Sequence, residues 1–240
     1  MGTLHWNPED SMLVAGLLTS VAGFGLYRTF SRHVQHIFRL STRFPALEPQ
    51  AFQVLLQRVW GILFLMILPL GFVTICFDLD PSYFGLGARF LRPPPLWGFL
   101  IVPVLLAVVF LLSSSPANLK KYPQIRSATW TRGLLVFSAI SWVVFLVAYE
   151  FLFRGLLLFS SITVLNSWTA VILNVTLYAF AHIYKGLPEL LLSIPFGFIL
   201  CYLTLVTGNI WCAVALHSII ALSSEWLSLK AHPQMKLAIK

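Results

Sequence analysis

The chain has 240 residues, of which 58% are hydrophobic and only 10% are charged, and its formal net charge is +8. An average soluble domain carries about 25% charged residues; the mean hydropathy here is +0.85, so the composition excludes an ordinary soluble protein and indicates an integral membrane protein. The basic residues lie between apolar runs and not in one patch with interleaved aromatic residues, which argues against nucleic acid as a partner.

Apolar runs of about twenty residues recur along the chain, and each can cross a bilayer as a helix. They do not alternate with polar residues, so a β-barrel is not expected. We predict an all-α polytopic transmembrane helical bundle, a single integral membrane domain over residues 1–240 with about seven spans, within a range of six to eight. The predicted spans are 11–27, 59–77, 96–113, 133–158, 168–184, 189–207 and 209–228. The fourth is longer than a simple crossing needs and is expected to break near Gly155.

The distribution of positive charge predicts how the chain is oriented. Five arginines lie in residues 28–58, between the first two spans, and three lysines end the chain, whereas the first ten residues hold Glu9 and Asp10 and no basic residue. Basic residues accumulate on the cytoplasmic side of membrane proteins. The N-terminus is therefore predicted to lie outside and the C-terminus in the cytoplasm, which requires an odd number of spans.

Charged residues are nearly absent between Arg132 and Lys185, where Glu150 and Arg154 are the exceptions. On a helix these two residues are neighbours at i and i+4. A charge at the bilayer centre costs about 2.5–3.5 kcal/mol on insertion scales, so the pair needs a partner, a water-filled cavity or a function. A buried ion pair that only fixes helix packing is the alternative.

Other polar residues lie within the last predicted spans. Asn174, Tyr178 and His182 are four residues apart on the fifth span and therefore share one face. His217 lies on the seventh span. Glu225 lies near the end of that span and is expected at the membrane–water interface. Lipid rejects such groups, and they are satisfied when they point at one another. We therefore predict a polar cavity between spans four, five and seven.

A carboxylate and two imidazoles around a cavity suit the hydrolysis of an amide bond within the membrane. Glu150 can act as a general base that takes a proton from water. His182 and His217 can orient that water and donate to the oxyanion that develops. The same three side chains could instead bind zinc, because catalytic zinc sites commonly use three such ligands.

A proton-coupled transporter is a further and weaker interpretation of the polar residues. Chains of Glu and His can form the proton relay of a transporter, but the chain shows no inverted repeat or paired broken helices. Cys76, Cys201 and Cys212 lack metal-ligand spacing and are expected to be small buried residues.

Three short motifs follow one another in the C-terminal half. Residues 149–158 read Tyr-Glu-Phe-Leu-Phe-Arg-Gly-Leu-Leu-Leu, residues 178–182 read Tyr-Ala-Phe-Ala-His, and residues 208–217 end at His217. Their order and spacing resemble the CPBP (ABI) family of intramembrane glutamic endopeptidases, which includes the CAAX prenyl endopeptidases and bacteriocin-processing proteins. That family's motifs are Glu-Glu-x-x-x-Arg, Phe-x-x-x-His and His-x-x-x-Asn, and the resemblance covers residues 130–228.

The resemblance implies an enzyme, an intramembrane protease without a metal cofactor. Its catalytic residues would be Glu150, His182 and His217, supported by Arg154, Tyr149, Tyr178 and Asn174. In the family, a glutamate and a histidine activate water, and the second histidine with its Asn stabilises the oxyanion. The implied partners are membrane lipids and a peptide or prenylated protein substrate.

Three residues depart from the family's motifs. Tyr149 stands at the first glutamate, which is usually credited as the base, Tyr178 replaces Phe, and Ala221 replaces Asn. Loss of one oxyanion donor costs about a hundredfold in rate. Glu150 is expected to take over as the base, since one residue along a helix turns a side chain by about 100 degrees. The alternative is a catalytically impaired member that acts as a membrane scaffold, chaperone, or peptide- or lipid-binding protein.

Overall fold

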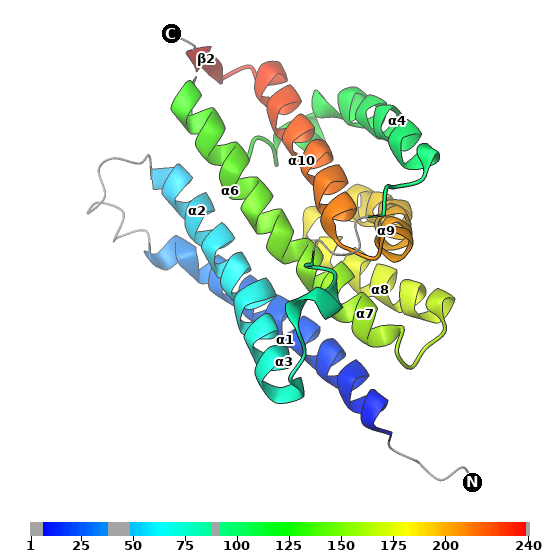
Figure 1. Ribbon diagram of the computed structural model, residues 1–240. Coiled ribbons are helices and arrows are strands. Elements are labelled where there is room, and N and C mark those ends of the chain that lie inside the picture. The colour runs from blue at the N-terminus through cyan, green and yellow to red at the C-terminus, as the bar shows by residue number, and fades with distance from the viewer. Residues whose placement is uncertain (1–6, 38–48, 88–91, 239–240) are drawn as a thin grey trace. The chain divides into compact units, whose positions relative to one another are not determined.

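The computed structural model describes residues 7–37, 49–87 and 92–238, and most of them are helical (Figure 1). The first half contains α1 (Pro8–Ile37), α2 (Pro49–Ile62), the π-helix η2 (Leu63–Ile67), α3 (Leu68–Phe77), the 3₁₀-helix η3 (Pro81–Phe84), α4 (Leu96–Ser113) and α5 (Pro116–Leu119). The second half contains α6 (Arg132–Glu150), the π-helix η4 (Phe151–Leu157), α7 (Leu158–Ser161), α8 (Ser167–His182), the 3₁₀-helix η5 (Ile183–Lys185), α9 (Leu187–Thr207) and α10 (Trp211–Ala231). The short strands β1 (Thr129–Thr131) and β2 (Lys236–Ala238) pair in parallel.

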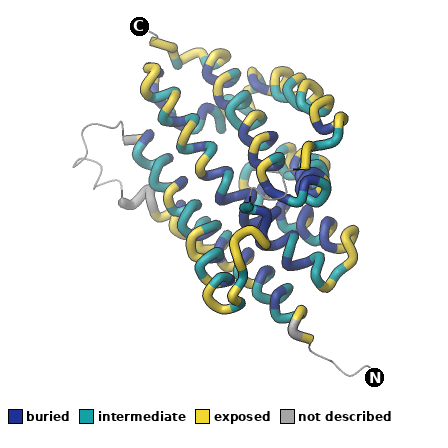
Figure 2. The backbone as a smooth tube through the Cα atoms, viewed as in Figure 1, coloured by how far each residue is buried: buried dark blue, intermediate teal, exposed yellow. Residues whose placement is uncertain are grey.

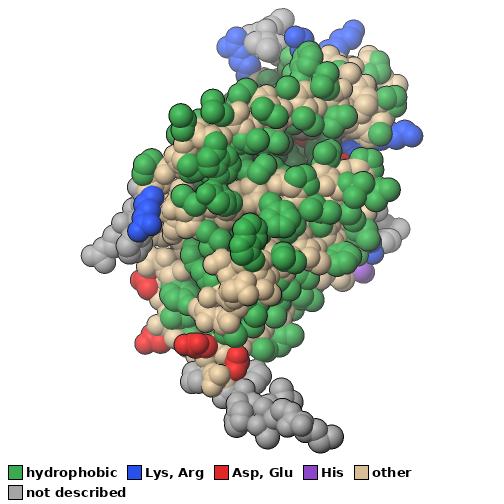
Figure 3. Space-filling view, turned by 90° about the vertical axis from the view of Figure 1, so that its right-hand side faces the viewer, with side chains coloured by type: hydrophobic (Ala, Val, Ile, Leu, Met, Phe, Trp, Pro, Cys, Tyr) green, Lys and Arg blue, Asp and Glu red, His purple; other side chains and the backbone are tan. Residues whose placement is uncertain are grey.

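Six helices in the described part of the chain are long and apolar enough to cross a membrane. They are Glu9–His33, Gln50–Phe77, Leu96–Ser113, Arg132–Ser161, Leu187–Thr207 and Trp211–Ala231. Hydrophobic side chains also cover most of the face that Figure 3 presents. The chain is therefore an all-α polytopic membrane protein, as predicted, and the count lies within the predicted range.

The predicted fifth span, 168–184, corresponds to α8, which has 16 residues. A helix of that length measures about 24 Å at 1.5 Å per residue. The hydrocarbon core of a bilayer is about 30 Å thick, which explains why α8 falls short of the six long helices. The predicted total of seven requires α8 to be counted as a crossing.

The first two helices are longer than predicted. Residues 28–58 are the longest polar stretch of the sequence, and an amphipathic interfacial helix expected there around 38–47 lies outside the described residues. α1 continues to Ile37 and α2 begins at Pro49. Arginine is a good helix former. Arg28 and Arg32 therefore do not end α1.

The fourth predicted span does not break near Gly155. α6, η4 and α7 form one continuous helix over Arg132–Ser161, with a π-helical segment at Phe151–Leu157. A π-turn widens a helix locally without ending it and occurs frequently at functional sites. A Cβ on Gly155 would lie 2.9 Å from the carbonyl oxygen of Phe84. A glycine therefore lets this helix lie close to the η3 backbone.

The chain divides into two compact units. The first comprises Met1–Leu26, Leu63–Pro94 and Ala148–Ala213, and the second comprises Tyr27–Ile62, Pro95–Val147 and Val214–Lys240. Figure 2 marks the buried residues in dark blue, and each unit has a core of its own. The core cluster of the first is Leu158, Ala170, Val171, Val175 and Cys201. That of the second is Ala51, Val54, Ile125, Trp130 and Leu229.

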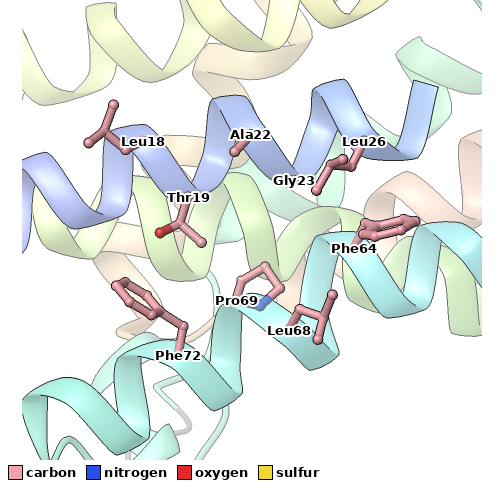
Figure 4. Close-up of a pocket in the computed structure, with 9 residues that line it drawn as sticks. All are labelled: Leu18, Thr19, Ala22, Gly23, Leu26, Phe64, Leu68, Pro69 and Phe72. Atoms are coloured by element: carbon pink, nitrogen blue, oxygen red, sulfur yellow. The ribbon is translucent and has the colours of Figure 1, made fainter. Parts of the chain in front are cut away.

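In the first unit, α1 packs closely on its neighbours through small residues. A Cβ on Gly16 would overlap the side chain of Ser160, and one on Gly23 would overlap the carbonyl oxygen of Phe64. Such small residues let membrane helices approach closely. Beside this contact, an apolar hollow of about 310 Å³ opens between α1 and α3, with Leu18 and Phe72 among its lining residues (Figure 4). The hollow contains none of the predicted site residues.

The second unit holds a buried polar cluster. The guanidinium of Arg58 donates from Nη1 to the carbonyl oxygen of Ser138 at 2.9 Å and from Nη2 to Oε1 of Gln124 at 3.3 Å. The backbone N–H of Gln124 donates in turn to both carboxylate oxygens of Glu225, at 3.0 and 3.1 Å. Glu225 is fully buried in the protein, and its predicted depth at the membrane–water interface stays a prediction. Its hydrogen-bond donor, Gln124, lies in a loop that is far away in sequence. The position of Glu225 along its own helix does not predict that contact.

The cysteines are free thiols with different surroundings. Cys201 is buried, Cys212 is partly buried and Cys76 is exposed. The expectation of burial is therefore wrong for Cys76, which lies on the membrane-spanning segment Gln50–Phe77. A small apolar side chain that faces lipid needs no protein cover.

Candidate active site around Glu150 and Arg154

The side chains of Glu150 and Arg154 form a buried ion pair. Nη1 of Arg154 lies 3.3 Å from Oε2 of Glu150, and neither side chain is exposed. Glu150 is the last residue of α6, and Arg154 lies in the π-helical segment that follows it. Pairing neutralises the two charges inside the protein, where a single charge would be strongly unfavourable. The neighbouring charges predicted from the sequence thus meet as an ion pair.

Residues of α8 cover the guanidinium of Arg154. Its Cζ lies 4.1 Å from the ring centroid of Tyr178, which is a cation–π arrangement. The ring of His182 packs against that of Tyr178 in a tilted arrangement, with the centroids 4.6 Å apart. Asn174, Tyr178 and His182 are all buried, so the face that they share points into the first unit.

The ring of His182 is oriented by its own helix. Its Nδ1 lies 2.9 Å from the carbonyl oxygen of Tyr178. A carbonyl oxygen only accepts hydrogen bonds, so Nδ1 carries the proton in this contact. In the neutral imidazole, Nε2 is then the acceptor, which is the form that can receive a proton from water.

Tyr149 lies beside the histidine. Its ring centroid is 6.2 Å from that of His182 and 5.9 Å from that of Tyr178. It also contacts Phe153 at 5.0 Å, and its side chain is buried. The aromatic residue at the family's first glutamate position therefore packs against the imidazole, while the next residue, Glu150, pairs with Arg154.

Helix α9 also contributes to this site, although the sequence reasoning did not assign it a part. The carbonyl oxygen of Gly197 accepts a hydrogen bond from Nη2 of Arg154 at 3.5 Å. The thiol of Cys201 donates to Oδ1 of Asn174 at 3.2 Å. Gly197 and Cys201 lie four residues apart on one face. Two small residues at this spacing are a pattern that could have indicated a close helix contact.

His217 lies on α10 in the second unit, and Ala221 follows it by one turn. The residues that the structure groups in the first unit are Glu150, Arg154, Asn174, Tyr178, His182 and Tyr149. The addition of His217 to this group stays a prediction, and so does the polar cavity between three spans. Within the described ranges, no three His, Cys, Asp or Glu side chains are grouped as metal ligands.

The fold and the buried site define a multi-pass helical membrane protein with a glutamate, an arginine and a histidine packed in its interior. Residues 130–223 match the family model described as type II CAAX prenyl endopeptidase Rce1-like. This match confirms the resemblance to the CPBP family over the segment that carries the three motifs, and it indicates a membrane endopeptidase of the CAAX protease type. No curated protein and no solved structure matches the chain.

Proposed function

We propose that the chain is an intramembrane endopeptidase that hydrolyses a peptide bond with a water molecule activated by Glu150. The observation that carries this proposal is the Glu150 carboxylate, which is fully buried in a membrane-spanning helix and paired with Arg154. It lies in the segment that matches a family of CAAX prenyl endopeptidases. An ionisable residue at membrane depth is expensive and is by default functional, and a desolvated carboxylate suits a general base.

Each neighbour has a proposed role. Arg154 holds the carboxylate of Glu150, and the ring of Tyr178 holds Arg154 in turn. His182 receives or relays a proton through Nε2, because its Nδ1 donates to a backbone carbonyl. His217, on α10, polarises the carbonyl of the scissile bond and donates to the developing oxyanion.

The proposed substrate is a prenylated peptide or protein held in the lipid bilayer. The description of the matching family names prenyl endopeptidases, and the buried Glu150–Arg154 pair lies on a helix that is long and apolar enough to cross a membrane. We further propose that the N-terminus lies outside and the C-terminus in the cytoplasm, which requires α8 to cross together with the six long helices. Labelling of single cysteines from either side of sealed vesicles tests this topology.

The proposed mechanism uses no metal. Zinc bound by Glu150, His182 and His217 is the alternative, but the Arg154 guanidinium lies 3.3 Å from the carboxylate and would repel a divalent cation. We expect cleavage to survive dialysis against a strong chelator. Loss of cleavage that added zinc restores would instead support the metal site.

The deciding experiment is cleavage of a prenylated peptide by the full chain reconstituted in lipid vesicles. Glu150→Gln should leave the protein folded and abolish cleavage. The matched control is Glu189→Gln, because Glu189 forms an i,i+4 pair with Lys185 at 3.7 Å on the partly exposed surface. Cleavage should be unchanged in the control, and full activity in Glu150→Gln would defeat the proposal.

One observation favours the second candidate function, a family member that binds peptide or lipid without cleaving it. Tyr149 is an aromatic residue packed against His182, where the family's motif has a carboxylate. Under this alternative, the wild type binds a prenylated peptide and leaves it intact across a broad pH range. Cleavage that appears only in Tyr149→Glu would show that the wild type is impaired at this position.

A further inference from the structure

A backbone carbonyl of the π-helical segment η4 has two hydrogen-bond donors. The amide of Leu158 donates to the carbonyl oxygen of Phe153, five residues earlier, as in a π-helix. The same oxygen accepts a hydrogen bond from Nδ2 of Asn174 at 2.5 Å. The carbonyl of Phe153 and the N–H of Arg154 belong to one planar peptide unit. The bond from Asn174 therefore fixes the peptide unit from which Arg154 projects.

The two hydrogen-bond partners of Asn174 allow only one orientation of its side-chain amide group. A carbonyl oxygen only accepts, so the oxygen of Phe153 requires the amide NH₂ group. The amide oxygen then faces α9, where the thiol of Cys201 donates to it at 3.2 Å. Asn174 and Cys201 are fully buried. A flipped amide would leave buried groups unsatisfied, which costs more than the bonds contribute.

Helix α9 supports the arginine as well as the asparagine. The carbonyl oxygen of Gly197 accepts from Arg154, and Gly197 lies one turn before Cys201 on the same face. A Cβ on Gly197 would lie 3.1 Å from the ring of Tyr178, so a glycine keeps α9 close to the site. Consecutive turns of α9 thus hold the Asn174 amide and the Arg154 guanidinium.

We propose that Asn174, oriented by the thiol of Cys201, is a positioning residue that sets the π-helical register of η4 and thereby aims Glu150 and Arg154. A π-turn is rare and occurs as a local insertion in an α-helix. When the bond from Asn174 is lost, the helix can return to the α-helical register, which rotates Glu150 relative to Arg154. The effect on catalysis rests on the proposed protease activity, whereas the effect on the π-helical register of η4 is independent of it.

The test measures how fast dicyclohexylcarbodiimide, an apolar reagent for carboxyl groups, modifies Glu150 in the full chain in lipid vesicles. Peptide mass spectrometry assigns the modified residue, and Glu150→Gln is the blank. In Asn174→Leu we expect modification about threefold to tenfold faster than in the wild type, which corresponds to one lost hydrogen bond. The matched control on the same helix is Thr176→Val, since the hydroxyl of Thr176 bonds to the carbonyl of Ile172 in its own helix. The control should react at the wild-type rate.

A second pair of variants keeps the test decisive if Asn174→Leu does not fold. Cys201→Ala removes the donor to Asn174, and Cys201→Ser restores a donor on the same short side chain. Modification of Glu150 should be faster in Cys201→Ala and should return to the wild-type rate in Cys201→Ser. Equal rates in every folded variant would overturn the positioning role and leave Asn174 as a residue that only packs helices.

Cleavage of a prenylated peptide gives an independent measurement. Asn174→Leu should lower kcat about threefold to tenfold at unchanged KM, because the aim of Glu150 changes and the peptide-binding surface does not. If the wild type cleaves nothing but the modification rates differ, the protease proposal fails and the positioning role stands. If cleavage depends on Glu150 while Asn174→Leu changes neither kcat nor modification, the positioning role fails and the protease stands.

Discussion

Both units bury a carboxylate and a guanidinium, but they connect the two groups differently. In the first unit, Glu150 and Arg154 lie on one helix and meet directly at 3.3 Å. In the second, Arg58 comes from α2 and Glu225 from α10, and both bind Gln124, which lies in the loop before β1. The first arrangement is local along the chain, whereas the second fastens distant segments together.

The surroundings of the two clusters also differ in chemistry. Arg154 is covered by the ring of Tyr178, and the imidazole of His182 packs against that ring. Arg58 likewise donates to a backbone carbonyl, but the ring beside it is the indole of Trp142, whose centroid lies 4.7 Å from Cζ of Arg58. An imidazole can exchange protons near neutral pH, and an indole cannot. The comparison therefore favours Glu150 over Glu225 as the proposed base and favours a structural role for the cluster of Arg58 and Glu225.

The largest expected effect is a difference in kcat between variants of the two buried carboxylates. Glu150→Gln should lower kcat about a hundredfold to ten-thousandfold, which is the contribution of a general base. Glu225→Gln should leave the kcat of the folded protein unchanged. Cleavage assays normalised to the folded fraction from size-exclusion chromatography measure both values. Similar losses of kcat in the two variants would remove the distinction between the units.

The second prediction tests the structural role of the cluster in the second unit. Arg58→Leu should destabilise the protein by about 3–5 kcal/mol, because it removes the stronger of the two arginine charges that act on the buried carboxylate of Glu225. Arg58→Leu combined with Glu225→Leu should lose less than the sum of the single variants, since neither charge is then left alone. Thermal unfolding in detergent, followed by circular dichroism, gives these values. Strictly additive losses would mean that the two residues are not coupled.

A smaller effect is expected where α9 approaches the site in the first unit. Gly197→Ala should destabilise the protein by about 1–3 kcal/mol, since the added Cβ would lie 3.1 Å from the Tyr178 ring and crowd it. The matched control is Gly25→Ala, where a Cβ meets no atom within 4 Å. There, alanine should stabilise α1 by up to about 1 kcal/mol. The same unfolding assay compares them, and equal shifts would contradict close packing at Gly197.

The smallest effect is expected for the surface pair between Lys185 and Glu189, which are 41% and 22% exposed. Its i,i+4 spacing equals that of the buried pair, so it isolates the effect of burial. Glu189→Gln should change the free energy of unfolding by no more than about 0.5 kcal/mol, and this small change should shrink further in high salt. A change as large as that of Arg58→Leu would contradict the small contribution expected of an exposed pair.

Hydropathy predicts most of the fold, because an apolar run of about twenty residues has few structural roles other than that of a membrane-spanning helix. The predicted span 96–113 has the same bounds as α4, and predicted spans six and seven lie within two or three residues of α9 and α10. Helix ends that carry arginine are not visible in hydropathy, which explains the extra turns of α1. The expected break near Gly155 is a π-helical segment, since excess length reveals an irregularity and not its kind.

The site is predictable where its contacts are local. The four-residue spacings from Glu150 to Arg154 and from Tyr178 to His182 correspond to direct contacts in the structure. The sequence does not predict the contribution of α9, because Gly197 and Cys201 are small and uncharged, and such residues are common in any apolar helix. The partner of Glu225 lies 101 residues away in sequence, and no periodicity links positions so far apart.

The parallel pairing of β1 and β2 affects how this protein can be handled. Thr131 lies opposite Ala238 in the register, and α6 begins at the next residue, Arg132. Strand pairing with Lys236–Ala238 thus holds the residues that lead into α6. Truncation before Lys236 would leave β1 without its partner strand, so an affinity tag or fluorescent fusion should not replace these last residues.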